Sequence, residues 1–218
     1  MKRNVVVGIF AHPDDEAFGP GGTLAKFAKK NDVYIICATS GESATGTVDE
    51  ALGKERRREL QKSAKDLGAK KVFFLGYKDG MLSNNLYHEV AEKVKKILLK
   101  LKPNILITFE PHGVSGHIDH IFMSMVTSFL FPQVPSAKKL MQHCIRYERS
   151  QLMNGKYFIY FPPGYHDDEI DEVVDVSDVW ETKLLAMHEH QSQINDINRI
   201  VEQSKHFPKE EYFLVIEK

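Results

Sequence analysis

Short apolar runs alternate with amphipathic stretches through the first half of the chain. Four runs of mostly β-branched, aliphatic or aromatic residues have the length and hydrophobicity of buried strands: 4–10, 32–39, 71–75 and 105–109. Three stretches between them have the spacing of helices: 21–30, 49–67 and 87–101. Gly68 and Pro103 end the last two of these helices. Strands that alternate with helices predict an α/β fold with a parallel, doubly wound sheet.

Each predicted strand is followed by a cluster of polar residues. The clusters occupy 12–15, 40–42, 76–79 and 110–120. Ligands of doubly wound sheets bind beyond the carboxyl ends of the strands. We therefore expect all four clusters to line one edge of the sheet.

The pattern weakens after Phe131, where prolines interrupt it. The remaining elements that we predict are a strand at 172–176, a helix at 180–190, a helix or turn toward 205, and an edge strand at 212–216. No internal repeat, linker or low-complexity stretch divides the chain. We therefore expect residues 1–218 to form a single domain.

Composition and charge are those of an ordinary soluble protein. The chain is 42% hydrophobic and 27% charged, and its 29 basic and 30 acidic residues give a formal charge of −1. This balance indicates no nucleic-acid partner. No apolar stretch approaches the roughly 20 residues of a membrane helix, and none has the form of a signal peptide. We expect a cytoplasmic protein without a membrane partner, in which Cys37 and Cys144 stay reduced.

The segment Ala11-His12-Pro13-Asp14-Asp15-Glu16 directly follows the first predicted strand. Three consecutive acids would repel one another unless a positive group lay beside them, and a divalent metal is the simplest such group. Pro13 restricts the backbone on both sides, so that a turn can bring His12 and a carboxylate to one point. Adjacent side chains diverge, so we expect one aspartate to bind the metal and the other to face the metal-bound water.

A second cluster, His117-Ile118-Asp119-His120, follows the fourth strand and begins a predicted helix. The two histidines are three residues apart and share a helical face. A catalytic zinc has three protein ligands and an open position for water. His12, one aspartate of the first motif and one histidine of the second would meet that count, although spacing does not choose between the two members of either pair. The same donors suit Fe²⁺ or another divalent metal.

At these residues the chain resembles the LmbE-like, or PIG-L, family of zinc-dependent de-N-acetylases, which carries an AHPDDE motif and an HPDH-type motif. Ile118 stands where the family usually has proline. Similar residues follow in the family's order: Gly21-Gly22-Thr23-Leu24, Thr39-Ser40-Gly41-Glu42, Arg56 with Glu59-Leu60, Leu67-Gly68, and Leu75-Gly76 with Asp79-Gly80. Near the C-terminus, the family's closing KxxAxxxHxSQ signature has its counterpart in Lys183, Ala186, His190, Ser192 and Gln193.

The resemblance implies a Rossmann-like, three-layer α/β/α fold and removal of acetyl groups from N-acetylglucosamine conjugates. It also implies that His12, Asp15 and His120 bind zinc. Asp14 would then be the general base, and a protonated His117 would stabilise the oxyanion. Because members of the family often form trimers or hexamers, we expect a homo-oligomer that acts on a small acetylated amino sugar.

The resemblance assigns four further residues around this centre. Asp119 would set the orientation and charge of a ligand histidine. Glu42, Arg56 and Asp79 would face the sugar hydroxyls, although a helix cap, a helix-surface charge and a turn residue explain these three as simply. Ser115 stands where some relatives have a tyrosine near the oxyanion, which leaves the type of substrate open.

Two other classes of function remain alternatives. A phosphoesterase-like hydrolase would bind two metals, and would need more acidic ligands than Asp14, Asp15 and Glu16 readily supply. A non-catalytic Rossmann-like nucleotide binder would need a glycine-rich loop after the first strand. His12-Pro13-Asp14 stands there instead, and three acids would repel a pyrophosphate.

Overall fold

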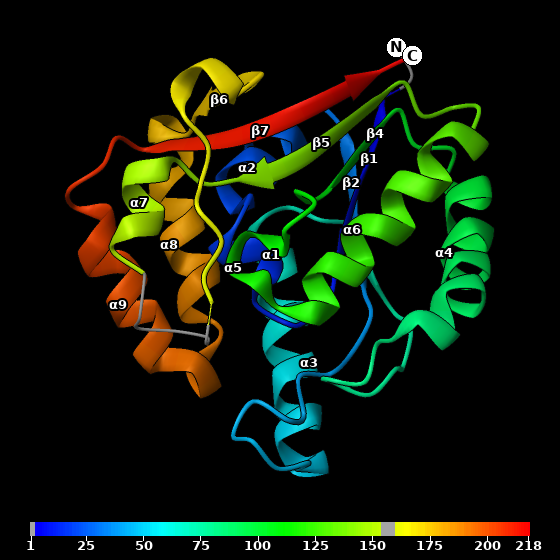
Figure 1. Ribbon diagram of the computed structural model, residues 1–218, viewed down its shortest axis with the longest axis horizontal. Helices are drawn as coiled ribbons and strands as arrows, with labels where there is room; N and C mark the ends of the chain where they lie inside the picture. The colour runs from blue at the N-terminus through cyan, green and yellow to red at the C-terminus, as the bar shows by residue number, and fades with distance from the viewer. Residues whose placement is uncertain (1–2, 154–159) are drawn as a thin grey trace.

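A seven-stranded sheet forms the centre of the computed structural model, which describes residues 3–153 and 160–218 (Figure 1). The strand order is β3-β2-β1-β4-β5-β7-β6, and the first five strands in this order are parallel. β7 runs antiparallel to both of its neighbours. The strands are β1 (Val5–Phe10), β2 (Asp32–Cys37), β3 (Lys71–Phe74), β4 (Ile105–Phe109), β5 (Lys139–Cys144), β6 (Glu172–Asp175) and β7 (Glu210–Glu217).

Helices cover both faces of the sheet, which confirms the predicted three-layer arrangement (Figure 1). On one face α4 packs against α6, and α6 contacts β1 and β4; on the other, α8 packs against α2 and α3. The α-helices are α1 (Asp15–Phe18), α2 (Gly21–Ala28), α3 (Glu50–Asp66), α4 (Tyr87–Leu101), α5 (Gly113–Gly116), α6 (Ile118–Leu130), α7 (Tyr147–Gln151), α8 (Trp180–His188) and α9 (Ile194–Ser204). Short 3-10 turns lie at Asn84–Leu86, Phe131–Gln133, Asp167–Glu169, Ser177–Val179 and Gln191–Gln193.

β1 and β4 lie in the middle of the sheet, and helices bury both of their faces. Val6, Val7, Ile9, Leu106 and Ile107 are fully buried. Double burial explains why these strands have continuous apolar runs instead of alternating apolar and polar residues.

The boundary between β1 and β4 determines where a site can form. From β1 the chain crosses to β2 on one side, whereas β4 lies on the other side and leads to β5. Such a reversal of strand order leaves a crevice beyond the carboxyl ends of the two strands. The segments 11–16 and 110–120 begin at these two ends.

The four strands and three helices predicted in the first half are confirmed, with ends that differ by at most two residues. β5 was not predicted, because Gln142 and His143 interrupt its apolar run; both side chains are nevertheless buried. The expectation of an edge strand at 212–216 is wrong in position. β7 lies between β5 and β6, and β6 forms the edge.

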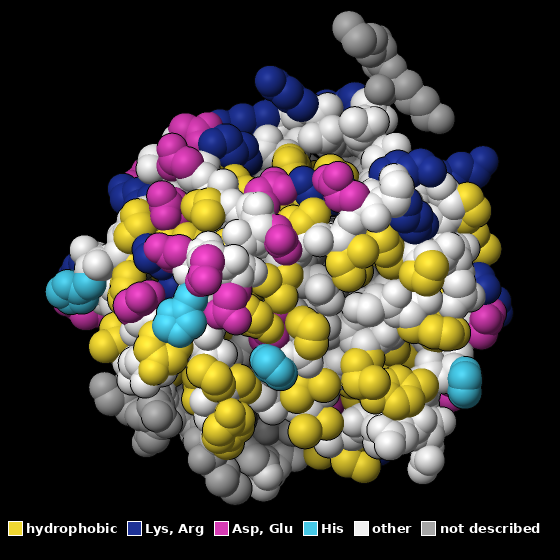
Figure 2. Space-filling model, turned by 45° about the horizontal axis from the view of Figure 1, so that its top comes forward, with side chains coloured by type: hydrophobic (Ala, Val, Ile, Leu, Met, Phe, Trp, Pro, Cys, Tyr) yellow, Lys and Arg dark blue, Asp and Glu magenta, His cyan; other side chains and the backbone are white. Residues whose placement is uncertain are grey.

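Charged side chains protect the β6 edge. Figure 2 shows acidic side chains gathered on this face of the molecule. The exposed acids in and around β6 are Asp167, Asp168, Glu169, Asp171 and Asp175. Charges of one sign discourage this edge from pairing with the sheet of another molecule.

Two further expectations can be compared with the described residues. Cys37 and Cys144 are free and buried, as predicted. Within residues 3–153 and 160–218, no helix combines the length and the hydrophobicity that crossing a bilayer requires.

A buried ion pair joins the C-terminal part of the chain to α2. Lys183 Nζ on α8 donates to Glu211 Oε1 on β7 at 2.6 Å. The same carboxylate accepts the backbone N–H groups of Gly22 and Thr23 at 2.8 and 2.7 Å. Glu211 therefore binds the N-terminal turn of α2 and the side chain of α8 together.

Replacing Lys183 by Met should lower the free energy of unfolding by about 3–5 kcal/mol, because the Glu211 carboxylate would stay buried without its cation. Lys29 is the exposed control, because its partner Asp178 is also half exposed. Lys29→Met should change the free energy of unfolding by less than about 1 kcal/mol. Urea titration followed by circular dichroism measures both variants, and equal losses would contradict the role given to Lys183.

Candidate metal centre and active site

A cavity of about 560 Å³ opens beyond the carboxyl ends of β1 and β4. Its volume is in the roughly 300–1,000 Å³ range of pockets that enclose small molecules. The predicted site residues that line it are His12, Asp14, Asp15, Arg56, Asp79, His117 and His120. Glu42 and Asp119 lie behind this lining and contact it through hydrogen bonds.

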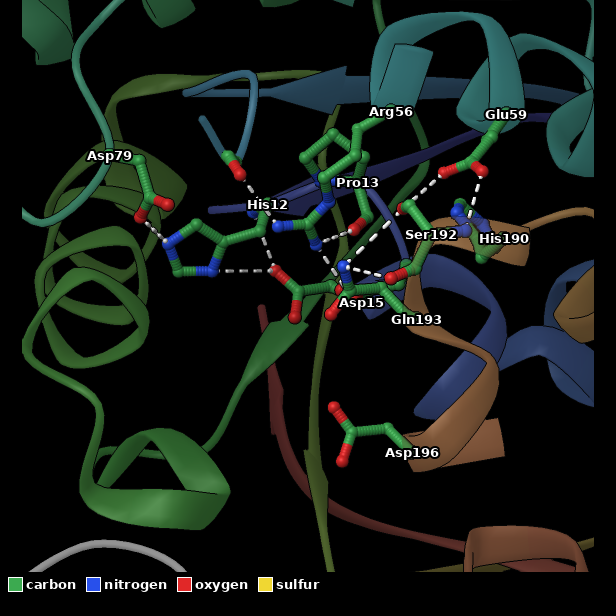
Figure 3. Close-up of polar contacts among 12 residues, drawn as sticks. His12, Pro13, Asp15, Arg56, Glu59, Asp79, His190, Ser192, Gln193 and Asp196 are labelled. Carbon is green, nitrogen blue, oxygen red and sulfur yellow. Dashed lines mark hydrogen bonds and ion pairs between the residues drawn. The ribbon is translucent and has the colours of Figure 1, made fainter. Parts of the chain in front are cut away.

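Three of these side chains converge on one point. His12 Nδ1 lies 3.1 Å from His120 Nε2, and the Asp15 carboxylate lies 3.2 Å from His120 Nε2 and 3.7 Å from His12 Nδ1. Ligand atoms about 2.0–2.1 Å from a tetrahedral zinc lie roughly 3.4 Å from one another. The spacing of the three groups therefore fits a single metal ion. Figure 3 shows the His12 ring between Asp79 and Asp15.

Hydrogen bonds on the outer side of each histidine set its tautomer. His12 Nε2 donates to Asp79 Oδ1 at 2.9 Å and lies 3.2 Å from Asp119 Oδ2. His120 Nδ1 donates to the Gly113 carbonyl at 3.1 Å. With these nitrogens protonated, the lone pairs of His12 Nδ1 and His120 Nε2 face each other, as metal ligation requires.

The electrostatics of the cluster favour a positive charge at this point. Burial lowers the pKa of His12, but the hydrogen bonds of Asp119 and Asp79 and the charge of Asp15 outweigh burial and raise this pKa to about 10. Burial raises the pKa of Asp15, but His120 and His12 together hold it below its usual range. Both shifts show that the carboxylates attract a cation, which either a proton or a divalent metal can supply.

Two other sets of ligand atoms lie within 4.8 Å of one another: those of His12, His117 and His120, and those of His12, Asp79 and Asp119. In the first set, His117 Nδ1 already accepts the backbone N–H of Asp119 at 3.1 Å and so caps α6. In the second, both carboxylates lie against the Nε2 side of His12. In the His12, Asp15 and His120 set, Asp15 Oδ1 faces His120, whereas Asp15 Oδ2 also accepts the backbone N–H groups of Ala11 and His12 at 3.1 and 2.7 Å.

Asp14 lies beside this point in a strained turn that Arg56 holds. Its φ is 114°, a value that residues other than glycine rarely adopt. Arg56 Nη2 donates to the Pro13 carbonyl at 2.6 Å and to Asp14 Oδ2 at 2.8 Å, while Nη1 donates to the Gly41 carbonyl at 2.8 Å. Figure 3 shows Arg56 directed at the Pro13 carbonyl. The Asp14 carboxylate thus contacts Arg56, whereas the Asp15 carboxylate contacts His12 and His120.

Burial raises the pKa of Asp14 to about 6, although the charge of Arg56 acts in the opposite direction. A carboxylate with such a pKa is ionised at neutral pH but accepts a proton more readily than an exposed aspartate. This is the property that a general base needs.

Glu16 supports the same turn from inside the core. Its Oε2 accepts the backbone N–H of Asp14 at 3.1 Å, and its Oε1 accepts from Ser63 Oγ at 2.5 Å and from His190 Nε2 at 2.8 Å. Glu16 and His190 are both fully buried. We predicted no role for His190 from the sequence, but its ring contacts Glu16, which in turn accepts the backbone N–H of Asp14.

Three of the four polar residues of the C-terminal signature share one property, whereas Gln193 donates to Ser192. Lys183 binds Glu211 and His190 binds Glu16, while Ser192 donates to Glu59 through its backbone at 2.8 Å and its hydroxyl at 2.6 Å (Figure 3). Each pairs with a buried acid far away in the sequence. Acids that stand among apolar residues in the sequence need basic or hydroxyl partners when they are buried. A search of the sequence for such partners would have indicated these contacts.

His117 lies next to the converging ligands, with its ring centroid 4.6 Å from that of His12. Burial and the positive charges of His12 and His120 lower the pKa of His117 to about 4. At neutral pH it is therefore uncharged, and the expectation of a protonated His117 is wrong. Because Nδ1 accepts from Asp119, the proton of the neutral ring is on Nε2, which is a hydrogen-bond donor.

Asp79 and Glu42 form a supporting layer behind His12. Asp79 Oδ2 accepts the backbone N–H of Ser43 at 3.0 Å, and Glu42 Oε1 accepts the backbone N–H of Asp79 at 3.0 Å. Asp79 thus joins the 40–43 loop to the His12 ring. Contacts of Glu42, Arg56 and Asp79 with sugar hydroxyls stay predictions.

Ser115 lines the cavity close to His117. Its Oγ is buried and has no hydrogen-bond partner among the described residues. The neighbouring Val114 has a φ of 62°, a strained value for a β-branched residue. Glu110 helps to hold this loop, because its Oε1 accepts the backbone N–H of Val114 at 2.6 Å.

Comparison with protein families and known proteins gives consistent matches. Residues 7–130 match the family model described as PIG-L: GlcNAc-PI de-N-acetylase. The chain is 32% identical to the 1D-myo-inositol 2-acetamido-2-deoxy-alpha-D-glucopyranoside deacetylase of Mycobacterium sp. (strain JLS), across 86% of this chain and 73% of that protein. It is 28% identical to the probable N-acetyl-alpha-D-glucosaminyl L-malate deacetylase 2 of Bacillus cereus, across 88% of this chain and 84% of that protein.

Among solved structures, the fold matches that of the N,N'-diacetylchitobiose deacetylase from Pyrococcus horikoshii complexed with its inhibitor MPG. The TM-score is 0.71 and the sequence identity 28%, and the match covers 98% of this chain and 84% of that one. The names of these three proteins share a deacetylase activity but differ in the group attached to the amino sugar.

Replacing Arg56 by Gln should raise the pKa of Asp14 above its value of about 6. We expect a rise of roughly one to two units, because an opposite charge at this distance lowers the pKa of a carboxylate by about 1–3 units. Carboxyl-carbon NMR of the protein in chelator measures this pKa.

Arg57 provides the matched control, because it is the adjacent residue and its guanidinium lies over the Phe74 ring instead of the site. Arg57→Gln should leave the pKa of Asp14 unchanged. A pKa that stays constant or falls in Arg56→Gln would show that Arg56 does not stabilise the Asp14 carboxylate.

Proposed function

We propose, because the chain belongs to the PIG-L family of GlcNAc-PI de-N-acetylases, that it is a metal-dependent hydrolase which deacetylates an N-acetylglucosamine-type conjugate. The observation that carries the proposal is the convergence of His12 Nδ1, His120 Nε2 and the Asp15 carboxylate beside the partly buried Asp14. The deacetylase names of the three relatives support it. The products would be acetate and a free amine.

His12, Asp15 and His120 would hold the metal, which we infer to be Zn²⁺, with Fe²⁺ or another divalent ion also suited to these donors. When bound, the metal supplies polarisation of the acetamide carbonyl and lowers the pKa of a water to about 7. Asp79 and Asp119 keep the Nε2 proton of His12 on the outer side of the ring. Such outer contacts orient the ring and make it a stronger ligand.

Asp14 would be the general base. Its carboxylate takes a proton from water as the water oxygen attacks the acetamide carbon. When the bond between that carbon and nitrogen breaks, Asp14 passes the same proton to the leaving amine. Arg56 and Glu16 fix the carboxylate for both transfers, because they bind its side chain and its backbone N–H respectively.

His117 would stabilise the oxyanion as a neutral donor. Its lowered pKa leaves the ring uncharged at neutral pH, so that Nε2–H donates a hydrogen bond to the developing negative charge. A positively charged His117 would repel the metal, and it would share the attraction of the nearby carboxylates with the metal and the ligand histidines. The neutral ring avoids this repulsion.

The alternative of a two-metal phosphoesterase is not favoured by the arrangement. Asp79 and Asp119 could supply oxygens to a second ion, but these oxygens already accept from His12 and from the backbone N–H groups of Ser43 and Gly80. Few lone pairs of these oxygens are left to bind a second ion, and His12 would have to bind both metals. One metal per chain is therefore the expected stoichiometry.

An amine-release assay on N-acetylglucosamine conjugates tests the proposed activity. With added Zn²⁺ the protein should release equal amounts of acetate and free amine, and a chelator should abolish the release. Asp14→Asn should retain the metal but lose about 10²–10⁴-fold in kcat, as expected when a general base is removed. Asp168→Asn, an exposed control, should keep full activity. Full activity in Asp14→Asn would exclude Asp14 as the base.

Metal analysis tests the ligand assignment independently of activity. His120→Ala should weaken zinc binding by more than about 100-fold, because removal of a direct ligand exceeds the 10–100-fold effect of an orienting residue. The control is His112→Ala, whose side chain is 59% exposed. Isothermal titration and elemental analysis measure affinity and stoichiometry. Unchanged zinc content in His120→Ala would overturn the assignment of His120.

A further inference from the structure

The cavity continues beyond the converging ligands to a second end, which we call the distal end. Segments from the weakly patterned second half of the chain form it: the end of β5, α7 and α9. The residues on which the following argument depends are His143, Arg149, Asp196, Arg199, Ile145 and Ile200, all of which line the cavity. Figure 3 shows Asp196 apart from the cluster formed by His12, Asp15 and Arg56.

Arg149, on α7, supplies a positive charge to the distal end. Within the described part of the chain, its guanidinium forms no ion pair and no hydrogen bond, and only the charges of Tyr212 and Glu211 act on it from a distance. A guanidinium stays protonated in proteins, so burial cannot neutralise it. A partly buried cation without a partner is costly unless an anion binds there.

Other cations near the cavity do have partners. Arg56 binds Asp14, Lys183 binds Glu211, and Arg199 binds Asp196 at 2.6 Å. The charge of Glu211 does act on Arg149. However, its carboxylate is already bonded to Lys183 and to two backbone N–H groups of α2. The acids of the surrounding elements therefore leave the charge of Arg149 uncompensated.

His143 is a second polar residue at the distal end. Its side chain is 92% buried, it lines the same end of the cavity, and its Nδ1 has no hydrogen-bond partner among the described residues. Burial and the nearby charges of Lys183 and Arg149 outweigh the charge of Glu211 and lower the pKa of His143 to about 3. The ring is therefore neutral and adds a polar atom, but no charge, beside Arg149.

We propose that the distal end binds the aglycone of the substrate, and that Arg149 holds a carboxylate or phosphate group on that aglycone. The inference rests on the proposed function, because the acetamide at the metal fixes the sugar and directs its substituent away from β1. A guanidinium binds either anion through charge-assisted hydrogen bonds. Ile145 and Ile200 offer apolar contact for the carbon atoms between the sugar and the anion.

The charges that line the cavity differ in whether they are paired. At the metal end Arg56 pairs with Asp14, and at the distal end Arg199 pairs with Asp196, whereas Arg149 has no acidic partner among the described residues. The unpaired charge of Arg149 would therefore attract an anionic aglycone to the distal end. The curated relatives are named for conjugates of inositol, which is uncharged, and of L-malate, which carries carboxylates. The charge of Arg149 places this chain with the second chemistry.

Matched conjugates test the proposal. N-acetylglucosaminides with a carboxylate, a phosphate or an uncharged hydroxyl at the same position of the aglycone are compared by amine release. The wild-type protein should show a kcat/KM at least about 10-fold higher for an anionic conjugate than for the neutral one, as one charge-assisted contact implies. The preferred anion identifies the group that Arg149 binds.

Arg149→Gln should lower kcat/KM for the preferred anionic conjugate by about 10–100-fold, mainly through KM, and leave the neutral conjugate within about twofold. Arg149→Lys should recover part of the preference, because it keeps the charge but loses the planar fork. Arg146→Gln is the control: Arg146 adjoins α7 but binds Asp167 outside the cavity.

Each result bears on a different claim. Equal losses for the charged and neutral conjugates, or a wild-type protein without preference for an anion, would overturn the role of Arg149 and leave the deacetylase assignment intact. Release of amine from none of the conjugates would overturn the proposed function itself. Thermal unfolding of each variant shows whether Arg149 acts on stability instead, which would also contradict the inference.

Discussion

The fold depends on supplying a partner to every carboxylate that lies buried around the carboxyl ends of β1 and β4. A buried charge without a partner costs several kcal/mol, so each acid there needs a cation or hydrogen-bond donors. Arg56 donates a hydrogen bond to Asp14, and His190 donates one to Glu16. These partners come from α3 and from the segment after α8. Satisfying the acids of one short motif therefore joins distant parts of the chain.

The same constraint explains how the strained turn at Asp14 persists. A positive φ at a residue other than glycine costs energy and survives only where several contacts hold it. Arg56 binds the turn at the Pro13 carbonyl and the Asp14 side chain, while Glu16 binds the Asp14 backbone. The strain separates two adjacent carboxylates, so that Asp15 faces the histidines while Asp14 is held by a cation. A relaxed turn would lose this division.

The parts of the fold that could be predicted are the elements whose own run of apolar and polar residues identifies them. Strands that are buried on both faces, such as β1 and β4, have continuous apolar runs, and the four strands of the first half were found in this way. β5 has the same position between two strands but carries Gln142 and His143, whose polarity hides it. The mistaken edge position of β7 has a related cause, since pairing order is a property of the whole sheet and not of one segment.

The candidate site was predictable to a similar depth. Local spacing and strand order placed the two histidine motifs at one edge of the sheet, where side chains of both motifs do meet. The choice of Asp15 and His120 within each pair came from the family resemblance and not from spacing. The tautomers of His12 and His120, the neutral state of His117 and the contact between His190 and Glu16 depend on three-dimensional neighbours that no spacing reveals. Sequence patterns thus indicated the chemistry but not its protonation states.

Selectivity for the aglycone has a different origin from catalysis in this architecture. The metal end is built from the loops that follow β1 and β4, where the topology of the sheet itself creates a crevice. The distal end is built from α7, α9 and the end of β5, and its charge comes from Arg149. Because α7 and α9 lie outside the sheet, their polar residues can change without disturbing the ligands. A fold of this kind can therefore keep one amide chemistry while the charge of Arg149 and its neighbours sets which conjugate enters.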